Sequence, residues 1–126
     1  MAKILLMDDE PEFVEMLSLR LRKTGGYEVI TAFDGEEGLK AAQANRPDLI
    51  ILDLMMPKMD GRKVIEELKK SDQTRGIPVI VLSASASPKT AEELLKLGGF
   101  DFIVKPFEPP TLMAKIKAAL EKKNAR

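Results

Sequence analysis

The residues best suited to chemistry in this sequence are polar side chains that directly follow short apolar runs. Asp8 and Asp9 follow the first run, Asp53 the third, Ser83 the fourth and Lys105 the fifth. The chain contains no His and no Cys, which excludes disulfides and thiolate metal sites and removes the usual general base. Any catalytic chemistry must therefore rest on carboxylates, lysines and hydroxyls.

The apolar runs that precede these residues predict five strands. They are rich in leucine and β-branched residues and are apolar on consecutive positions, which is typical of strands covered on both faces in a parallel sheet. The predicted strands are residues 4–7, 29–32, 49–52, 79–82 and 102–104.

Helical spacing and helix-terminating residues separate the strands. Asp34 can cap the second helix, with Glu37 three residues later as in a capping box, and Pro88 suits the first position of the fourth. The helices are expected at about 13–23, 34–45, 61–71 and 87–98, with a fifth that starts after Pro109-Pro110. Five strand–helix units with right-handed crossovers predict a doubly wound α/β sandwich.

In an open parallel sheet, ligand sites lie at the carboxyl ends of the strands, so the polar residues should converge there. Each also has an ordinary interpretation: Asp8 or Asp9 could cap a helix, Asp53 could be a turn residue, Ser83 a loop hydroxyl and Lys105 a solvated charge. Three like charges gathered at one edge would destabilise the fold unless something compensated them. Together the residues therefore favour a functional site.

Length and composition restrict the classes of protein. The 126 residues are enough for one domain with a single core, while the last six, 121–126, are expected to be a frayed tail or the stub of a linker. Twenty basic residues balance twenty acidic ones, so we expect no direct binding to nucleic acid or to a membrane surface. The start of the chain lacks the pattern of a signal peptide, and a cytoplasmic location is the default expectation.

Four blocks of sequence, in order along the chain, resemble the receiver domain of two-component response regulators, in the CheY-like superfamily. They are ILLMDDE at 4–10, DLMMPKMDG at 53–61, VLSA at 81–84 and GGFDFIVKPF at 98–107. The resemblance covers nearly the whole chain. It implies a five-stranded sheet with the flavodoxin-like strand order 2-1-3-4-5.

The resemblance also implies a phosphate acceptor and a metal site. Asp53 would take a phosphoryl group from the phosphohistidine of a sensor histidine kinase or a phosphotransfer protein, forming an acyl phosphate. Asp8, Asp9 and Asp53, with the backbone carbonyl of Met55, would hold Mg²⁺. The chain would thus be a switch rather than an enzyme, with phosphotransfer to Asp53 and slow dephosphorylation as its own chemistry.

Ser83 and Lys105 would contact the phosphoryl oxygens, by the same resemblance. Ser83 would move toward the phosphate and Phe102 would turn inward, changing the face made by the fourth helix, the fifth strand and the fifth helix. That face would control a target or an attached effector domain, and it could also form a homodimer. Phe102 could equally be a plain core aromatic, and Phe replaces the Tyr that is frequent at this place in the family.

Two other classes of function fit the sequence less well. A phosphatase or phosphotransferase with an Asp nucleophile commonly has a second acid two residues later, where this chain has Met55, and no insertion is long enough for a cap segment. A module on the same fold that is never phosphorylated would need a degenerate acidic cluster, whereas Asp8, Asp9 and Asp53 are all present. Met55 and Ser85 occupy the places from which side chains assist hydrolysis in the family, and neither should hold an in-line water well.

Overall fold

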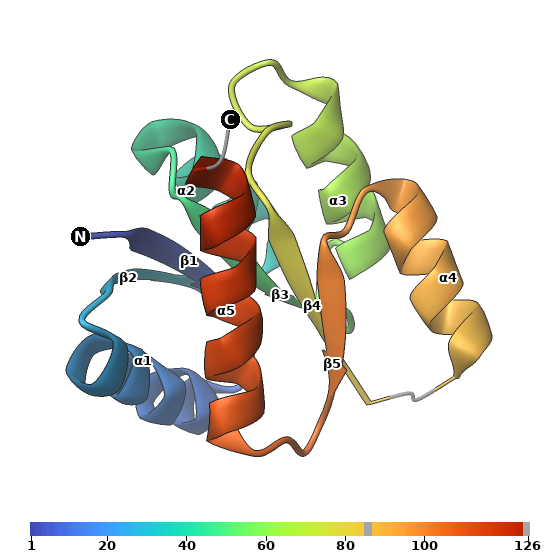
Figure 1. The fold of residues 1–126 in the computed structure, drawn as a ribbon. Helices are drawn as coiled ribbons and strands as arrows, with labels where there is room; N and C mark the ends of the chain where they lie inside the picture. Colours follow the sequence, from blue (N-terminus) through green and yellow to red (C-terminus); the bar gives the residue numbers. More distant parts are fainter. Residues whose placement is uncertain (85–86, 125–126) are drawn as a thin grey trace.

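Five parallel strands form one sheet in the order β2-β1-β3-β4-β5 (Figure 1), which confirms the predicted fold class. The computed structural model describes residues 1–84 and 87–124. Each strand matches its predicted run to within one residue at either end. The strands are β1 (Lys3–Met7), β2 (Glu28–Ala32), β3 (Leu49–Asp53), β4 (Val79–Ser83) and β5 (Asp101–Val104).

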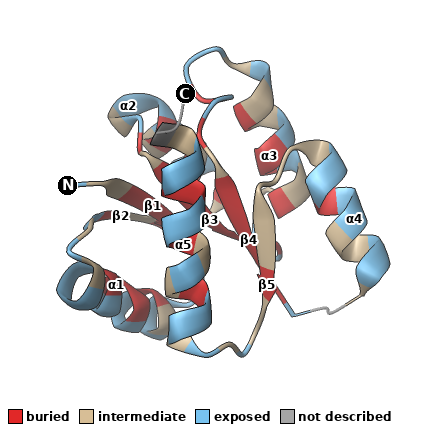
Figure 2. Cartoon of the chain, viewed as in Figure 1, coloured by how far each residue is buried: buried red, intermediate tan, exposed pale blue. Residues whose placement is uncertain are grey.

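Helices cover both faces of the sheet, which explains why the strands are apolar on consecutive residues. Ile4 and Leu6 of β1 pack with α1 and α5 on one face, whereas Leu5 and Met7 pack with α2, α3 and α4 on the other. Figure 2 shows the buried central strands β3 and β4 between helices whose outer surfaces are exposed, whereas most of the edge strand β5 is intermediate. The helices are α1 (Pro11–Gly25), α2 (Gly35–Asn45), α3 (Gly61–Lys70), α4 (Pro88–Leu97) and α5 (Pro109–Asn124).

The helix ends follow the predicted capping chemistry. The Asp34 side chain accepts a hydrogen bond of 2.8 Å from the Glu37 amide, which satisfies one free N–H at the start of α2. Gly26 ends α1 in the left-handed conformation, with φ of 69°. α5 continues to Asn124, and residues 125 and 126 lie outside the described part of the chain, so the frayed tail or linker stub expected at 121–126 stays a prediction.

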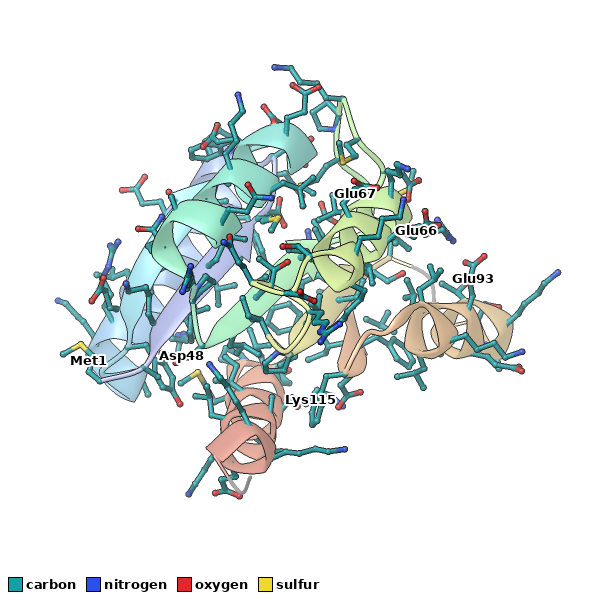
Figure 3. The ribbon with its side chains drawn as sticks, turned by 90° about the horizontal axis from the view of Figure 1, so that it is seen from above. Met1, Asp48, Glu66, Glu67, Glu93 and Lys115 are labelled. Atoms are coloured by element: carbon teal, nitrogen blue, oxygen red, sulfur yellow. The ribbon has the colours of Figure 1, made fainter. Side chains whose placement is uncertain are left out.

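Charged side chains lie on the outer surfaces of the helices. Figure 3 shows Glu66 and Glu67 on α3 and Glu93 on α4 at the periphery of the molecule. The Arg62 guanidinium at the start of α3 pairs with Glu93, which ties α3 to α4 across the surface. Among the described residues, no helix is both long enough and apolar enough to cross a membrane.

The parallel register aligns the carboxyl ends of the strands. Met7 stands opposite Leu52, and the next residue of β3, Asp53, stands opposite Leu82 of β4. The loop after β3 then folds back, because the Gly61 amide donates to the Leu54 carbonyl at 2.9 Å. A β-carbon on Gly61 would lie only 2.8 Å from the backbone of Leu54, so the loop beside Asp53 depends on this close approach.

Gly61→Ala should therefore lower the free energy of unfolding by about 1–3 kcal/mol, the usual cost of overpacking against atoms that cannot move aside. Gly76→Ala is the matched control, because a β-carbon there meets nothing within 4 Å. Urea denaturation of both variants measures the difference. Equal stabilities would show that the backbone at Leu54 yields without strain.

Candidate functional site

Charged side chains from three segments meet at the carboxyl edge of the sheet. The Lys105 ammonium donates to Asp8 Oδ2 at 2.8 Å and lies 3.5 Å from Glu10 Oε1 and 3.6 Å from Asp53 Oδ2. One carboxylate oxygen from each of Asp8, Glu10 and Asp53 lies within 4.8 Å of the others. We call these four residues the acidic edge.

The ends of the strands place the acidic edge. Asp8 directly follows β1 and is fully buried, while Asp53 is the last residue of β3 and is 7% exposed. The Lys105 amide donates to the Ser83 carbonyl at 2.8 Å, which extends the pairing of β4 and β5 by one residue. The side chain of Lys105 can then reach Asp8, although the two residues are 97 positions apart in the sequence.

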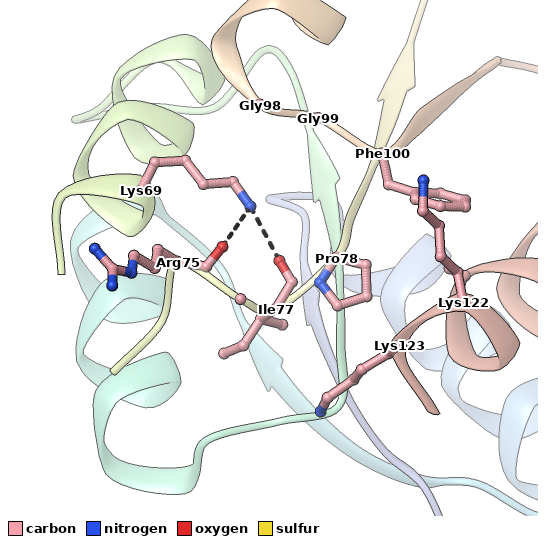
Figure 4. A pocket seen from close by; sticks show the side chains of 11 residues that line it. Lys69, Arg75, Ile77, Pro78, Gly98, Gly99, Phe100, Lys122 and Lys123 are labelled. Carbon is pink, nitrogen blue, oxygen red and sulfur yellow. Dashed lines mark hydrogen bonds between the residues drawn. The ribbon is translucent and has the colours of Figure 1, made fainter. Parts of the chain in front are cut away.

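A different kind of hollow lies at the opposite, amino-terminal edge of the sheet (Figure 4). It has a volume of about 310 Å³, and its lining includes Lys69, Phe100, Lys122 and Lys123. The Lys69 ammonium donates to the carbonyls of Arg75 and Ile77 at 3.0 and 3.3 Å, and burial lowers the pKa of Lys69. No lining residue carries a carboxylate or a nucleophilic hydroxyl, so the acidic edge is the candidate site.

Comparison with known proteins identifies the family. The model of the response regulator receiver domain matches residues 4–117. The chain belongs to this family.

Related proteins and solved structures support the assignment to the receiver-domain family. This chain is 42% identical, over 95% of its length, to the alkaline phosphatase synthesis transcriptional regulatory protein PhoP of Bacillus subtilis, and it covers 49% of that protein. It is 37% identical to hybrid signal transduction histidine kinase D of Dictyostelium discoideum, covering 98% of this chain and 8% of that protein. The structure of chemotaxis protein CheY4 of Vibrio cholerae is 37% identical with a TM-score of 0.88, covering 94% of this chain and 98% of that one. The chain spans about half the length of PhoP and of the probable transcriptional regulators ycf27 of Cyanophora paradoxa and Guillardia theta.

Burial and repulsion shape the charge on Asp53 of the receiver domain. Burial, followed by the negative charge of Asp8, raises the pKa of Asp53 to about 6, although Lys105 and the Met55 amide act in the opposite direction. Burial alone would lower the pKa of Lys105, but its hydrogen bond to Asp8 and the charges of Asp53 and Glu10 raise it instead. The lysine is thus held charged, while burial and the charge of Asp8 disfavour the ionised form of the Asp53 carboxylate.

The donor set of the acidic edge suits a magnesium ion. Mg²⁺ prefers oxygen ligands and keeps several waters, so one or two carboxylates beside open solvent are enough to hold it. Burial is the main cause of the raised pKa of Asp53, and the negative charge of Asp8 adds to it; a divalent cation would relieve that repulsion. The receiver domain therefore fits the ion that the sequence predicted.

The carboxylates that meet in the structure differ at one residue from the ligand set that the sequence predicted. Asp8, Asp9 and Asp53 were predicted as ligands, whereas one carboxylate oxygen from each of Asp8, Glu10 and Asp53 lies close together. Asp9 is exposed and outside this group, yet its negative charge still raises the pKa of Asp53, so it lies nearby. The ligand set therefore stays a prediction, and Glu10 is a further carboxylate whose sequence signal was the acidic run before the first helix.

The remaining predicted residues lie around the acidic edge. Ser83 ends β4, 2% exposed, on the strand next to Asp53. The Met55 amide donates to Asp53 Oδ1 at 3.3 Å, which sets the Met55 backbone beside Asp53, while Met55 as a whole is 69% exposed. Phe102 lies on β5, half-buried against the core on the α4 side. Ser85 lies outside the described residues.

The pKa of Asp53 predicts how stability changes with pH. Because the native state raises this pKa from 3.8 to about 6, the folded protein holds the proton more tightly than the unfolded chain does. The contribution is therefore favourable at low pH and is lost as the pH rises from about 4 through 6, a change of about 3 kcal/mol.

Without divalent cations, Asp53→Asn should have the same free energy of unfolding as the wild type near pH 4. At pH 7 its free energy of unfolding should be higher by up to about 3 kcal/mol. Urea unfolding across this pH range measures the difference. Asp72→Asn, at a side chain that is 86% exposed, is the control and should show no such trend. A difference that stays constant with pH would contradict the raised pKa.

Proposed function

We propose that this receiver domain is a signalling switch that accepts a phosphoryl group on Asp53 from the phosphohistidine of a histidine kinase or phosphotransfer protein. The observation that carries the proposal is the pairing of a nearly buried acceptor, Asp53, with the Lys105 ammonium 3.6 Å away. Such a pair combines a carboxylate nucleophile with the positive charge that developing phosphoryl charge requires.

The transfer step uses groups of this chain in defined roles. A carboxylate oxygen of Asp53, mostly ionised at neutral pH, attacks the phosphorus of the donor, the phosphorus–nitrogen bond breaks, and the imidazole leaves with that electron pair. The Lys105 ammonium and the Ser83 hydroxyl bind the phosphoryl oxygens. Phosphorylation adds roughly one negative charge to an edge that already holds several, so the positive charge of Lys105 is needed after the transfer as well as during it.

We propose that Asp8, Asp9, Asp53 and the backbone carbonyl of Met55 hold Mg²⁺, with Glu10 beside them. When bound, the ion supplies charge neutralisation for the acceptor and the phosphoryl oxygens. Three predicted carboxylates carry −3, which Mg²⁺ and Lys105 offset. The charge of Glu10 is additional, and its side chain, 66% exposed, can turn to solvent.

The response to phosphorylation is proposed to run through Ser83 and Phe102 to the α4-β5-α5 face. Ser83 moves toward the phosphate, and the half-buried Phe102 turns inward into the space that is released. The face then controls a target, an attached effector domain or a homodimer. Support for an attached effector comes from PhoP of Bacillus subtilis, a transcriptional regulatory protein about twice as long as this chain.

We further propose that residues 1–126 act as one receiver unit in the cytoplasm, without binding nucleic acid themselves. The equal numbers of acidic and basic residues support this absence of nucleic-acid binding. The chain remains a switch rather than an enzyme, because its phosphoryl chemistry acts on its own Asp53.

The test of the acceptor is the intact mass after incubation with acetyl phosphate and Mg²⁺. With Mg²⁺, the wild type should gain the mass of one phosphoryl group. With EDTA in place of Mg²⁺ it should gain none, because the carboxylates then repel the donor. Asp53→Asn should gain none while keeping its circular dichroism spectrum. Asp72→Asn is the matched control and should label as the wild type does. Labelling of Asp53→Asn would place the acceptor elsewhere.

The lifetime of the acyl phosphate is expected to be long, because hydrolysis needs a water oriented in line with the phosphorus. Met55 projects into solvent beside Asp53 and offers only a weak sulfur acceptor. Met55→Asn should speed the loss of phosphate after donor removal several-fold, and Ser85→Glu should act in the same direction. Leu19→Asn, on the exposed side of α1, is the control. Decay that is unchanged in both variants would show that site exposure sets the lifetime.

A further inference from the structure

The Lys105 side chain makes one close contact at the acidic edge that is not with a carboxylate. Its ammonium lies 4.4 Å from the centre of the Phe13 ring, in the first turns of α1. The Phe13 ring in turn packs edge to face against Phe107, with centroids 6.2 Å apart and planes at 85°. Phe107 is two residues after Lys105, so the segment that carries the lysine also fixes the ring that faces it.

The carboxylates alone hold Lys105 in a position that metal binding would disturb. The ammonium is closest to Asp8, at 2.8 Å, and farther from Asp53, at 3.6 Å. A cation bound by Asp8 would compete with the ammonium for the same carboxylate. An aromatic face attracts an ammonium through its quadrupole and does not bind Mg²⁺ in water, so this contact persists when Asp8 turns to the metal.

Helical spacing by itself gives Phe13 a simpler role as an inward-facing apolar residue of α1. Phe13 is only half-buried, however, and it borders an open groove of about 390 Å³ together with Met16, Arg20 and Phe107. One side of the ring therefore faces the groove rather than the close-packed core. A residue that only filled volume would not need to be aromatic at this place.

We propose that Phe13, fixed by Phe107, is a positioning residue that seats the Lys105 ammonium beside Asp53 and keeps it there when the metal engages Asp8. The inference rests on the proposed function, in which Lys105 meets the phosphoryl group. Phe13 acts through Lys105 and touches neither the acceptor nor the phosphate.

The first experiment needs no phosphorylation. The ring current of Phe13 should shift the proton signals of the Lys105 ε-methylene upfield in a ¹H–¹³C spectrum, with assignment by their loss in Lys105→Ala. Phe13→Tyr should keep the shift, and Phe13→Leu should return the signals to the ordinary lysine position. Met16→Leu, on the same groove, is the control. Signals at the ordinary position in the wild type would overturn the proposal.

The second experiment is a double-mutant cycle on the rate of labelling by acetyl phosphate with Mg²⁺. Phe13→Leu should slow labelling by roughly 2- to 30-fold, the range of a cation–π contact, and Phe13→Tyr should restore it. In a Lys105→Ala background, Phe13→Leu should have no further effect. An equal loss in both backgrounds would show that Phe13 acts through packing and would overturn the positioning role.

The two proposals can fail separately. A wild type that labels normally, with an unshifted lysine signal, refutes the role of Phe13 and leaves the phosphoacceptor intact. A wild type that gains no phosphoryl group refutes the proposed function and, with it, the positioning role, whatever the lysine spectrum shows.

Discussion

The counter-charge that Lys105 supplies to Asp8 is the interaction on which the acidic edge depends. Asp8 is fully buried, and an unpaired buried carboxylate would cost several kcal/mol. Its partner comes from the far end of the chain, after the last strand of the sheet, so the edge is complete only when β5 has joined β4. Folding and assembly of the site are therefore one event.

Most of the fold could be predicted from sequence because its signals are local. Consecutive apolar residues identify buried strands, and the capping at Asp34 and the left-handed Gly26 identify helix ends within a few positions. The convergence of Asp53 and Lys105 on one edge followed from parallel topology alone. The end of α5 could not be predicted from sequence, because a charged helix terminus and a frayed tail have the same composition.

The details that sequence could not give depend on distant segments or on local backbone rotation. Which residue of an acidic run turns toward Asp53 is decided where β1 gives way to α1, and there the carboxylate that joins Asp8 is Glu10 rather than Asp9. Phe13 lies in the first helix predicted from sequence, at about 13–23. Helical spacing could not show that its ring faces the Lys105 ammonium, about ninety positions later in the chain.

The linings of the acidic edge and of the opposite hollow differ in sign, although acidic and basic residues are equal in number in the chain. Carboxylates gather where β1 and β3 end, and the hollow where β4 and β5 begin is lined by Lys69, Arg75, Lys122 and Lys123. Two of these cations are paired, Arg75 with Asp72 and Lys123 with Asp48, which reduces the positive charge of the hollow. The acidic edge has three carboxylates for one ammonium, so it would attract a positively charged surface at short range. This attraction would weaken as added salt shortens the Debye length.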